Sequence, residues 1–210
     1  MKQQNLVILI LVLFLSSCGM KTKEGLTENY DENKNGIIEL KNFYNKTVPK
    51  DFIVRIRYNS SDNIDLFVYQ PTENSEKHEL LFQQWNLDIN DYVPENPRSD
   101  YDKKYHGITN SFEKVKEKLN WTNETFAKIY DKLDDVNCMG ITNGNPTEIE
   151  YGFKGMGMFS YLIFDENLNS ELQEKHSDDC TQMFYKENVV LSYGSGAIGS
   201  LCTPEFKRNE

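Results

Sequence analysis

The sequence is short of basic residues, and no basic cluster stands out in it. Its 210 residues include 23 Lys and Arg against 33 Asp and Glu, which gives a formal net charge of −10 at pH 7. Nucleic-acid-binding domains normally carry a basic stripe, so we predict that this protein binds no nucleic acid. The acidity also argues against electrostatic adhesion to anionic lipid.

Recognisable catalytic and metal-binding patterns are lacking as well. The three histidines, His78, His106 and His176, stand in no motif, so we assign no catalytic residue and no cofactor. The segment at residues 176–180 (HSDDC) contains side chains that bind zinc, but their spacing matches no standard ligand pattern. No metal site is therefore predicted.

The one long apolar run covers residues 6–15, and this run is too short to span a bilayer, which takes about 20 residues. It follows Lys2 and precedes two serines and Cys18, an order typical of a secretory signal. Residues 15–18 (LSSC) resemble the bacterial lipobox, in which the cysteine is lipidated and becomes the first residue. We predict a signal peptide over residues 1–17 and acyl chains such as palmitate on Cys18. An ordinary cleaved signal with a chance cysteine is the alternative.

Lipidation would place the protein in the cell envelope, and we expect the outer membrane of a Gram-negative bacterium. Residues 18–32 are polar, so we predict a tether that does not pack, followed by a single domain over residues 33–210. Residues 31–42 imitate a calcium loop, but Asn42 stands where a bidentate Glu is expected. The segment therefore predicts a turn at Asn35 and Gly36.

The hydrophobic periodicity predicts an α+β fold. Alternation over residues 52–58 and 63–70 predicts a β-hairpin, and a strand over residues 79–85 closes an N-terminal antiparallel β-meander. Helical spacing predicts a central helical pair, from Ser111 to Leu119 and from the N-cap Thr122 onward. Short β-runs separated by turn signals then predict a C-terminal antiparallel sheet. These runs cover residues 139–142, 147–153, 158–164, 181–186 and 188–193, with a short helix over residues 168–176.

Three cysteines remain after Cys18: Cys138, Cys180 and Cys202. Export to the envelope permits disulfides, and an odd count leaves one thiol unpaired. We favour the pair Cys180 with Cys202, because these residues flank the last predicted hairpin and the glycine-rich loop after it can bring Cys202 back.

Two glycine-rich loops follow predicted strands, the first over residues 154–158 (KGMGM). The second, residues 194–199 (GSGAIG), has the spacing of the dinucleotide fingerprint, but no helix is predicted after it to bind pyrophosphate. We therefore predict no nucleotide site. Side by side, the loops would form either a small backbone-lined pocket or a tight corner. Their candidate binding positions are Gly155, Gly157, Gly194, Gly196 and Gly199.

Further candidates lie in a proline-containing loop over residues 90–107, which is long for a compact domain. Tyr92, Tyr101, Tyr105 and His106 stand in it, and tyrosines in polar loops are common at contact surfaces. The alternative is a surface loop whose tyrosines lie on the sheet.

One strand also carries a candidate carboxylate pair. Glu148 and Glu150 share a face of the predicted strand over residues 147–153, as the two acids of an acid–base pair would. Because Ile149 and Tyr151 occupy the opposite face, we expect both acids to face water.

Five segments of the second half carry a family resemblance. They are residues 121–125 (WTNET), 138–146 (CMGITNGNP), 155–161 (GMGMFSY), 179–180 (DC) and 189–204 (VVLSYGSGAIGSLCTP). Together they resemble an uncharacterised family of bacterial envelope lipoproteins. The resemblance implies no activity, only that the glycines and Cys180 and Cys202 belong to the family's pattern.

The sequence thus favours a non-catalytic binding domain held at the membrane by its lipid, with a protein partner in the envelope. One form is an immunity-type lipoprotein that blocks a toxin, and the acidic charge would suit a basic partner. The alternatives are an envelope enzyme that uses the Cys138 and His176 region, and a purely structural lipoprotein.

Overall fold

A helix, and not a tether, opens the described part of the chain. The computed structural model describes residues 21–72, 78–92, 111–195 and 202–207, and α2 (Lys23–Thr47) starts after the N-cap Thr22. The predicted tether over residues 18–32 is therefore wrong from Lys23 onward. The segment is polar on average, but its apolar residues recur at helical spacing and cover one side of the helix. Those buried are Leu26, Tyr30, Ile37, Leu40 and Tyr44.

The turn predicted at Asn35 and Gly36 is wrong too, since both residues lie inside α2, just after a departure from helical dihedral angles at Asn33. Gly36 has a packing role instead. A Cβ there would lie 2.8 Å from Cγ1 of Val136, so the glycine allows α2 to approach the end of α5 (Asn123–Asp134) closely.

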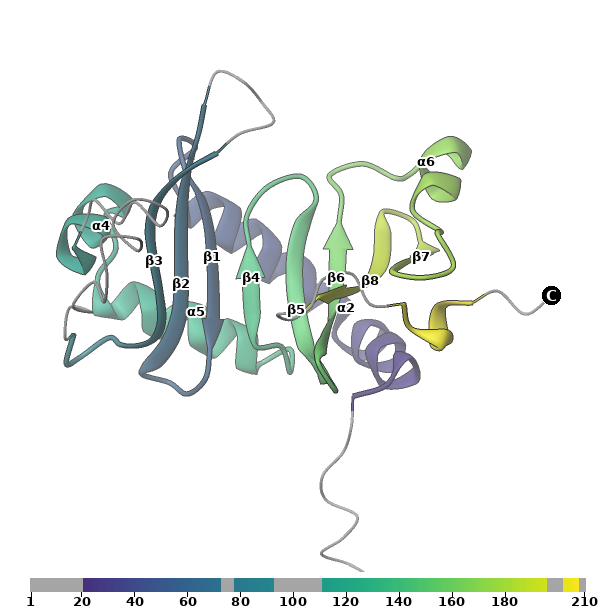
Figure 1. Ribbon diagram of the computed structural model, residues 1–210, viewed down its shortest axis with the longest axis horizontal. Helices are drawn as coiled ribbons and strands as arrows, with labels where there is room; N and C mark the ends of the chain where they lie inside the picture. The colour runs from purple at the N-terminus through teal and green to yellow at the C-terminus, as the bar shows by residue number, and fades with distance from the viewer. Residues whose placement is uncertain (1–20, 73–77, 93–110, 196–201, 208–210) are drawn as a thin grey trace, which may run out of the picture.

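The described strands form a single eight-stranded antiparallel sheet in the order β3-β2-β1-β4-β5-β6-β8-β7 (Figure 1). The predicted N-terminal meander and C-terminal sheet are therefore not separate, because β1 pairs with β4. Arg55 lies opposite Thr142 in this pairing and Ile56 opposite Ile141. The strands are β1 (Ile53–Tyr58), β2 (Asn63–Pro71), β3 (His78–Asp88), β4 (Gly140–Thr142), β5 (Thr147–Lys154), β6 (Gly157–Ile163), β7 (Gln182–Lys186) and β8 (Val189–Ser195).

The predicted helical pair is confirmed, and with it the α+β class. α4 (Phe112–Leu119) precedes α5, whose N-cap Thr122 forms a capping box with Thr125. The rings of Trp121 and Phe126 lie 5.3 Å apart, as expected of a hydrophobic staple at the start of a helix. Two short helices complete the described chain: α6 (Ser170–Lys175) and the 3₁₀ helix η1 (Pro204–Phe206).

The core lies between one face of the sheet and helices α2 and α5, which cross behind the sheet in Figure 1. Ile56, Ile149 and Leu191 are fully buried there, and burial of each such side chain is worth about 1.5–3 kcal/mol. The Tyr161 hydroxyl on β6 donates a hydrogen bond to the carbonyl of Leu26 at 2.8 Å, which ties the sheet to α2. No helix in the described ranges is long and apolar enough to cross a bilayer.

The predicted disulfide between Cys180 and Cys202 is confirmed. It joins the segment before β7 to the segment before η1, and the backbone N–H of Thr203 donates to the carbonyl of Cys180 at 3.0 Å. Phe206 is buried beyond it. Among the described cysteines, Cys138 has a free thiol, which is buried.

Candidate binding surface

The second face of the sheet, which we call the open face, has no described helix over its central strands and turns toward the viewer in Figure 1. Side chains alternate across a strand, so the neighbours of the core residues Ile56 and Ile149 point to this face. It therefore carries Arg55 and Arg57 of β1 and Glu150 of β5.

A row of polar positions crosses the open face at right angles to the strands. Its members, which we call the polar row, are cross-strand neighbours from β2 to β7, and such neighbours contact each other directly. They are Asp65, Arg57, Gly140, Glu150, Ser160, Ser192 and Gln182.

Glu150 is the centre of this row. Its side chain is 0% exposed, and its carboxylate accepts hydrogen bonds from Nε of Arg55 at 2.9 Å and from Nε of Arg57 at 2.5 Å. Each arginine adds a second bond through Nη2, at 2.5 and 3.0 Å. Asp65 lies 3.7 Å from Arg57 on the other side. Two guanidinium groups thus hold one buried carboxylate, so the prediction that both acids face water is wrong for Glu150.

Gly140 makes room for that carboxylate. A Cβ at this position would lie 2.6 Å from Oε2 of Glu150 and 2.9 Å from the carbonyl oxygen of Ile56. Contacts that short require the backbone or the carboxylate to move, so a side chain at position 140 is incompatible with the arginine–glutamate geometry.

The buried Glu150 influences the pKa values of two neighbouring groups, Arg55 and Glu148. Burial alone would lower the pKa of Arg55, but attraction to Glu150 and the hydrogen bonds to it outweigh burial, and the pKa is raised. Glu148 behaves in the opposite way: burial and repulsion by Glu150 raise the pKa of its carboxyl. Glu150 therefore holds the cation in place, while the protonated form of Glu148 is favoured relative to a free side chain.

Two exposed aromatic side chains flank the cluster. Trp85 of β3 is 46% exposed, and its ring meets Phe67 edge-on at 4.7 Å. Phe153 of β5 is 45% exposed, and the guanidinium of Arg57 lies 5.0 Å from the centre of its ring. Such contacts between cations and rings restrict the arginine further.

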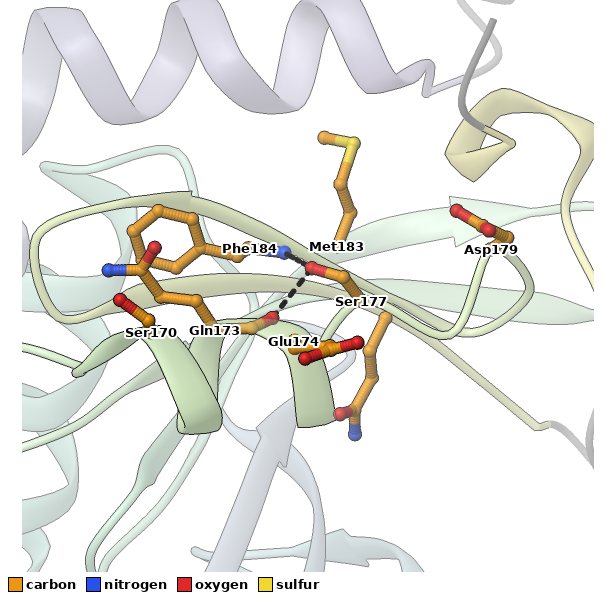
Figure 2. A pocket seen from close by; sticks show the side chains of 8 residues that line it. Ser170, Gln173, Glu174, Ser177, Asp179, Met183 and Phe184 are labelled. Carbon is orange, nitrogen blue, oxygen red and sulfur yellow. Dashed lines mark hydrogen bonds between the residues drawn. The ribbon is translucent and has the colours of Figure 1, made fainter. Parts of the chain in front are cut away.

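A separate cavity of about 440 Å³ lies between α6 and the edge strand β7. Figure 2 shows Ser177 at its centre, where Oγ donates to the carbonyl of Gln173 at 2.8 Å and accepts from the N–H of Phe184 at 3.1 Å. Nδ1 of His176 lies 2.7 Å from Oε1 of Gln182. These groups fasten α6 to the strand, and we infer a structural role for them.

The predicted tyrosine loop falls mostly outside the described residues. Tyr92 is described, and it is half-buried with its ring 5.3 Å from that of Phe112. Its ring therefore packs against helix α4. Tyr101, Tyr105 and His106 lie outside the described residues.

The strand ends that border the two glycine loops are paired, since Gly157 lies opposite Ser195 and Met158 opposite Gly194. A Cβ on Gly157 would lie 2.1 Å from the ring of Tyr193, so this ring fills the space above the glycine. The hydroxyl of Tyr193 donates to the carbonyl of Lys154 at 2.8 Å. The described part is a tight corner, and Gly155 has a φ of 59° at its turn. Gly196 and Gly199 lie outside the described residues.

Cys138 and His176 do not lie together. Cys138 precedes β4 and His176 precedes β7, and these strands are four spacings apart in the sheet, or about 19 Å. Burial raises the pKa of the Cys138 thiol to about 12, so it is protonated at neutral pH and is a poor nucleophile. Asp178 accepts hydrogen bonds from the N–H groups of the three residues Cys180, Thr181 and Gln182. In the described ranges no three acids, histidines or cysteines gather to hold a metal.

The open-face cluster is the site that reasoning from the sequence missed. The alternation had placed Arg55 and Arg57 together on one strand, and Glu148 and Glu150 together on another. The missing fact was that β4 alone separates these strands. The signal available in the sequence was that one predicted strand carries two arginines at alternate positions and another carries two glutamates in the same way.

Comparisons of the chain with protein-family models, with curated proteins and with solved structures give no match. Its function must therefore be inferred from the geometry of its own residues.

Proposed function

We propose that the protein is a lipid-anchored protein of the bacterial cell envelope that binds a protein partner through the open face, without catalysis. Cys18 would carry the lipid, in the outer membrane of a Gram-negative bacterium. This location agrees with the envelope lipoproteins that the second half of the sequence resembles.

One observation carries the binding role: Arg55 and Arg57 are fixed by the buried Glu150 within reach of exposed aromatic rings. Arg and Trp are the most frequent energetic anchors of protein interfaces. Arg55 is held by Glu150 and also lies 5.7 Å from the ring centre of Phe67, the residue on which Trp85 packs. Side chains that are already ordered lose less conformational freedom on binding, which favours affinity.

Charge supports a basic partner. With the signal peptide and its Lys2 removed, 22 basic and 33 acidic residues remain, a net charge of −11. Such a charge accelerates encounter with a positively charged protein and repels acidic ones. An immunity-type protein that blocks a basic toxin is one form of this proposal.

Site-specific photo-crosslinking in cells tests the binding face. A photoreactive amino acid would replace Trp85 on the open face or, as the control, Lys128, which is exposed on α5. We expect one adduct of defined mass from position 85 and none from position 128, and the Arg55→Ala variant should weaken it. An identical adduct from both positions, or none from position 85, contradicts the proposal.

Fractionation tests the anchor separately. Cys18→Ala should abolish labelling by radioactive palmitate and prevent recovery of the protein with the membranes, while the Cys138→Ser control keeps both. Membrane recovery that survives Cys18→Ala would exclude the lipid anchor without bearing on the open face.

A further inference from the structure

The turn between β5 and β6 exposes apolar side chains. Among the described residues, three large hydrophobic side chains are exposed, and two of them lie at this turn or beside it: Met156 in the turn, at 55%, and Phe153 near the end of β5, at 45%. Gly155, with its φ of 59°, forms the bend between them. Together the two side chains form a small exposed apolar patch, and contiguous patches of this kind mark interaction sites more often than single exposed residues do.

The turn lies close to Lys21, the first described residue. Nζ of Lys21 is 4.0 Å from the centre of the Tyr151 ring on β5, and a Cβ on Gly152 would lie 2.9 Å from Cγ of Lys21. Figure 1 shows the start of α2 and the β5–β6 turn at the same lower edge of the molecule. The first described residue therefore packs against the strand that leads into the exposed turn.

Covalent geometry brings this turn close to the proposed lipid. Cys18 is three residues before Lys21, and consecutive Cα atoms are about 3.8 Å apart, so their Cα atoms are separated by at most about 11 Å. The predicted tether would have allowed a larger distance, but α2 starts too early for a long tether to exist. If Cys18 is lipidated, acyl chains in a bilayer therefore hold the β5–β6 turn close to the membrane surface.

Neighbouring groups fit a lipid–water interface. Lys21, Lys23 and Lys154 surround the start of the chain and the turn, and Lys154 forms an ion pair with Glu205. Lysine side chains lay their apolar stems along a membrane surface and keep the ammonium group in water. The β1–β2 turn is at the same edge of the sheet, because β1 and β5 run parallel, but its residues 59–62 (NSSD) are polar and exposed. Of these two described turns, only the β5–β6 turn has exposed large apolar side chains at or beside it.

We propose that the β5–β6 turn is a second membrane contact, in which Phe153 and Met156 enter the interfacial layer of the bilayer beside the lipidated cysteine. Two contacts fix an orientation that one flexible anchor does not. The strands then stand steeply on the membrane with Phe153 at its surface, and the rest of the open face around Arg55 looks sideways, free for a partner. This inference rests on the proposed lipidation of Cys18.

The experiment uses the lipidated full chain in vesicles of phosphatidylethanolamine and phosphatidylglycerol. Met156→Cys supplies a thiol for an environment-sensitive fluorophore, because Cys180 and Cys202 are joined and Cys138 is buried. Glu166→Cys, exposed beyond the opposite end of β6, is the matched control. The seven residues of β6 put the two labels about 20 Å or more apart.

We expect a blue-shifted emission and quenching by nitroxide-labelled lipid at position 156, and neither at position 166. Phe153→Ser in the Met156→Cys background should reduce the quenching while the protein still floats with the vesicles. If the protein floats but the label at position 156 stays in water, the turn contact is wrong and the anchor stands. Equal quenching at both positions refutes the proposed orientation. Failure of the protein to float with the vesicles refutes the lipid anchor and, with the anchor, the turn contact that rests on it. A blue shift in whole envelopes but not in lipid vesicles would assign the turn to a protein partner and refute the lipid contact.

Discussion

Replacing Glu150 by glutamine should destabilise the fold more than any other single charge neutralisation on the open face. The substitution keeps the shape of the side chain and removes the charge that balances Arg55 and Arg57. The side chain of Arg57 is only 10% exposed, and its remaining carboxylate, Asp65, is 3.7 Å away. Removing one partner of a buried ion pair typically costs about 3–5 kcal/mol. Because the side chain of Arg55 is 35% exposed and can recover water, we expect the lower end, about 3 kcal/mol.

Urea unfolding of the non-lipidated chain, with the disulfide intact, measures this loss. With a slope of about 2 kcal/mol per molar urea, the midpoint should fall by about 1.5 M. Glu124→Gln is the matched control, since it removes a carboxylate from the exposed pair with Lys128 on α5, where ion pairs contribute little. Equal midpoints for the two variants would refute a buried, charge-balanced Glu150.

Three further predictions concern the same sheet and its edge. Gly140→Ala should lower the free energy of unfolding by about 1–3 kcal/mol, because the added methyl group overpacks against Glu150. Gly194→Ala is the control, since a Cβ there meets open space, and it should leave the urea midpoint unchanged. Equal losses in the two variants would show that the structure relieves the clash at position 140. Burial raises the pKa of Glu148 in the folded state. The stability that this group contributes to the fold is therefore complete below the ordinary carboxyl pKa, and it is lost as the pH rises through the raised folded-state pKa. Glu148→Gln should therefore raise the urea midpoint at pH 7, with less effect near about pH 4; a lower midpoint at pH 7 would contradict this. Burial would raise the pKa of Asp178, but hydrogen bonding outweighs it and lowers this pKa from its ordinary 3.8 to about 2. The stability that the ionised group contributes is therefore present above about pH 4 and is lost as the pH falls through about 2. Asp178→Asn should cost no more than about 1 kcal/mol at pH 7, because the group is exposed, and the difference from the wild type should vanish at the lowest pH; a constant difference would exclude the titration.

Local patterns predicted most of the individual elements. The hairpin of β1 and β2 follows from alternating apolar positions, and α5 from its cap Thr122, its staple and its helical spacing. The disulfide followed from the placement of Cys180 and Cys202 around one hairpin. Each of these features depends on residues close together in the chain, where spacing alone decides which side chains share a face.

α2 was missed although its signal is also local. Its polar residues lower the mean hydropathy of the segment, and this polar composition is typical of a tether. The spacing of Leu26 and Tyr30, which is that of a helix, was the better guide. The helix is stable because those side chains are buried against the sheet, since most helical stability in proteins comes from packing of one face.

By itself, the sequence determined that Arg55 and Arg57 share one face of a strand, that Glu148 and Glu150 share one face of another, and that Phe153 and Met156 stand near a turn. Only the tertiary structure decided that these residues meet. The pairing of β1 with β4 joins positions more than 80 residues apart, and no local periodicity specifies the partner of a strand. Because of that pairing, Glu150 is buried and Glu148 half-buried, although the sequence predicts that both face water. The burial of a side chain depends on which parts of the chain pack together, and local sequence does not specify this.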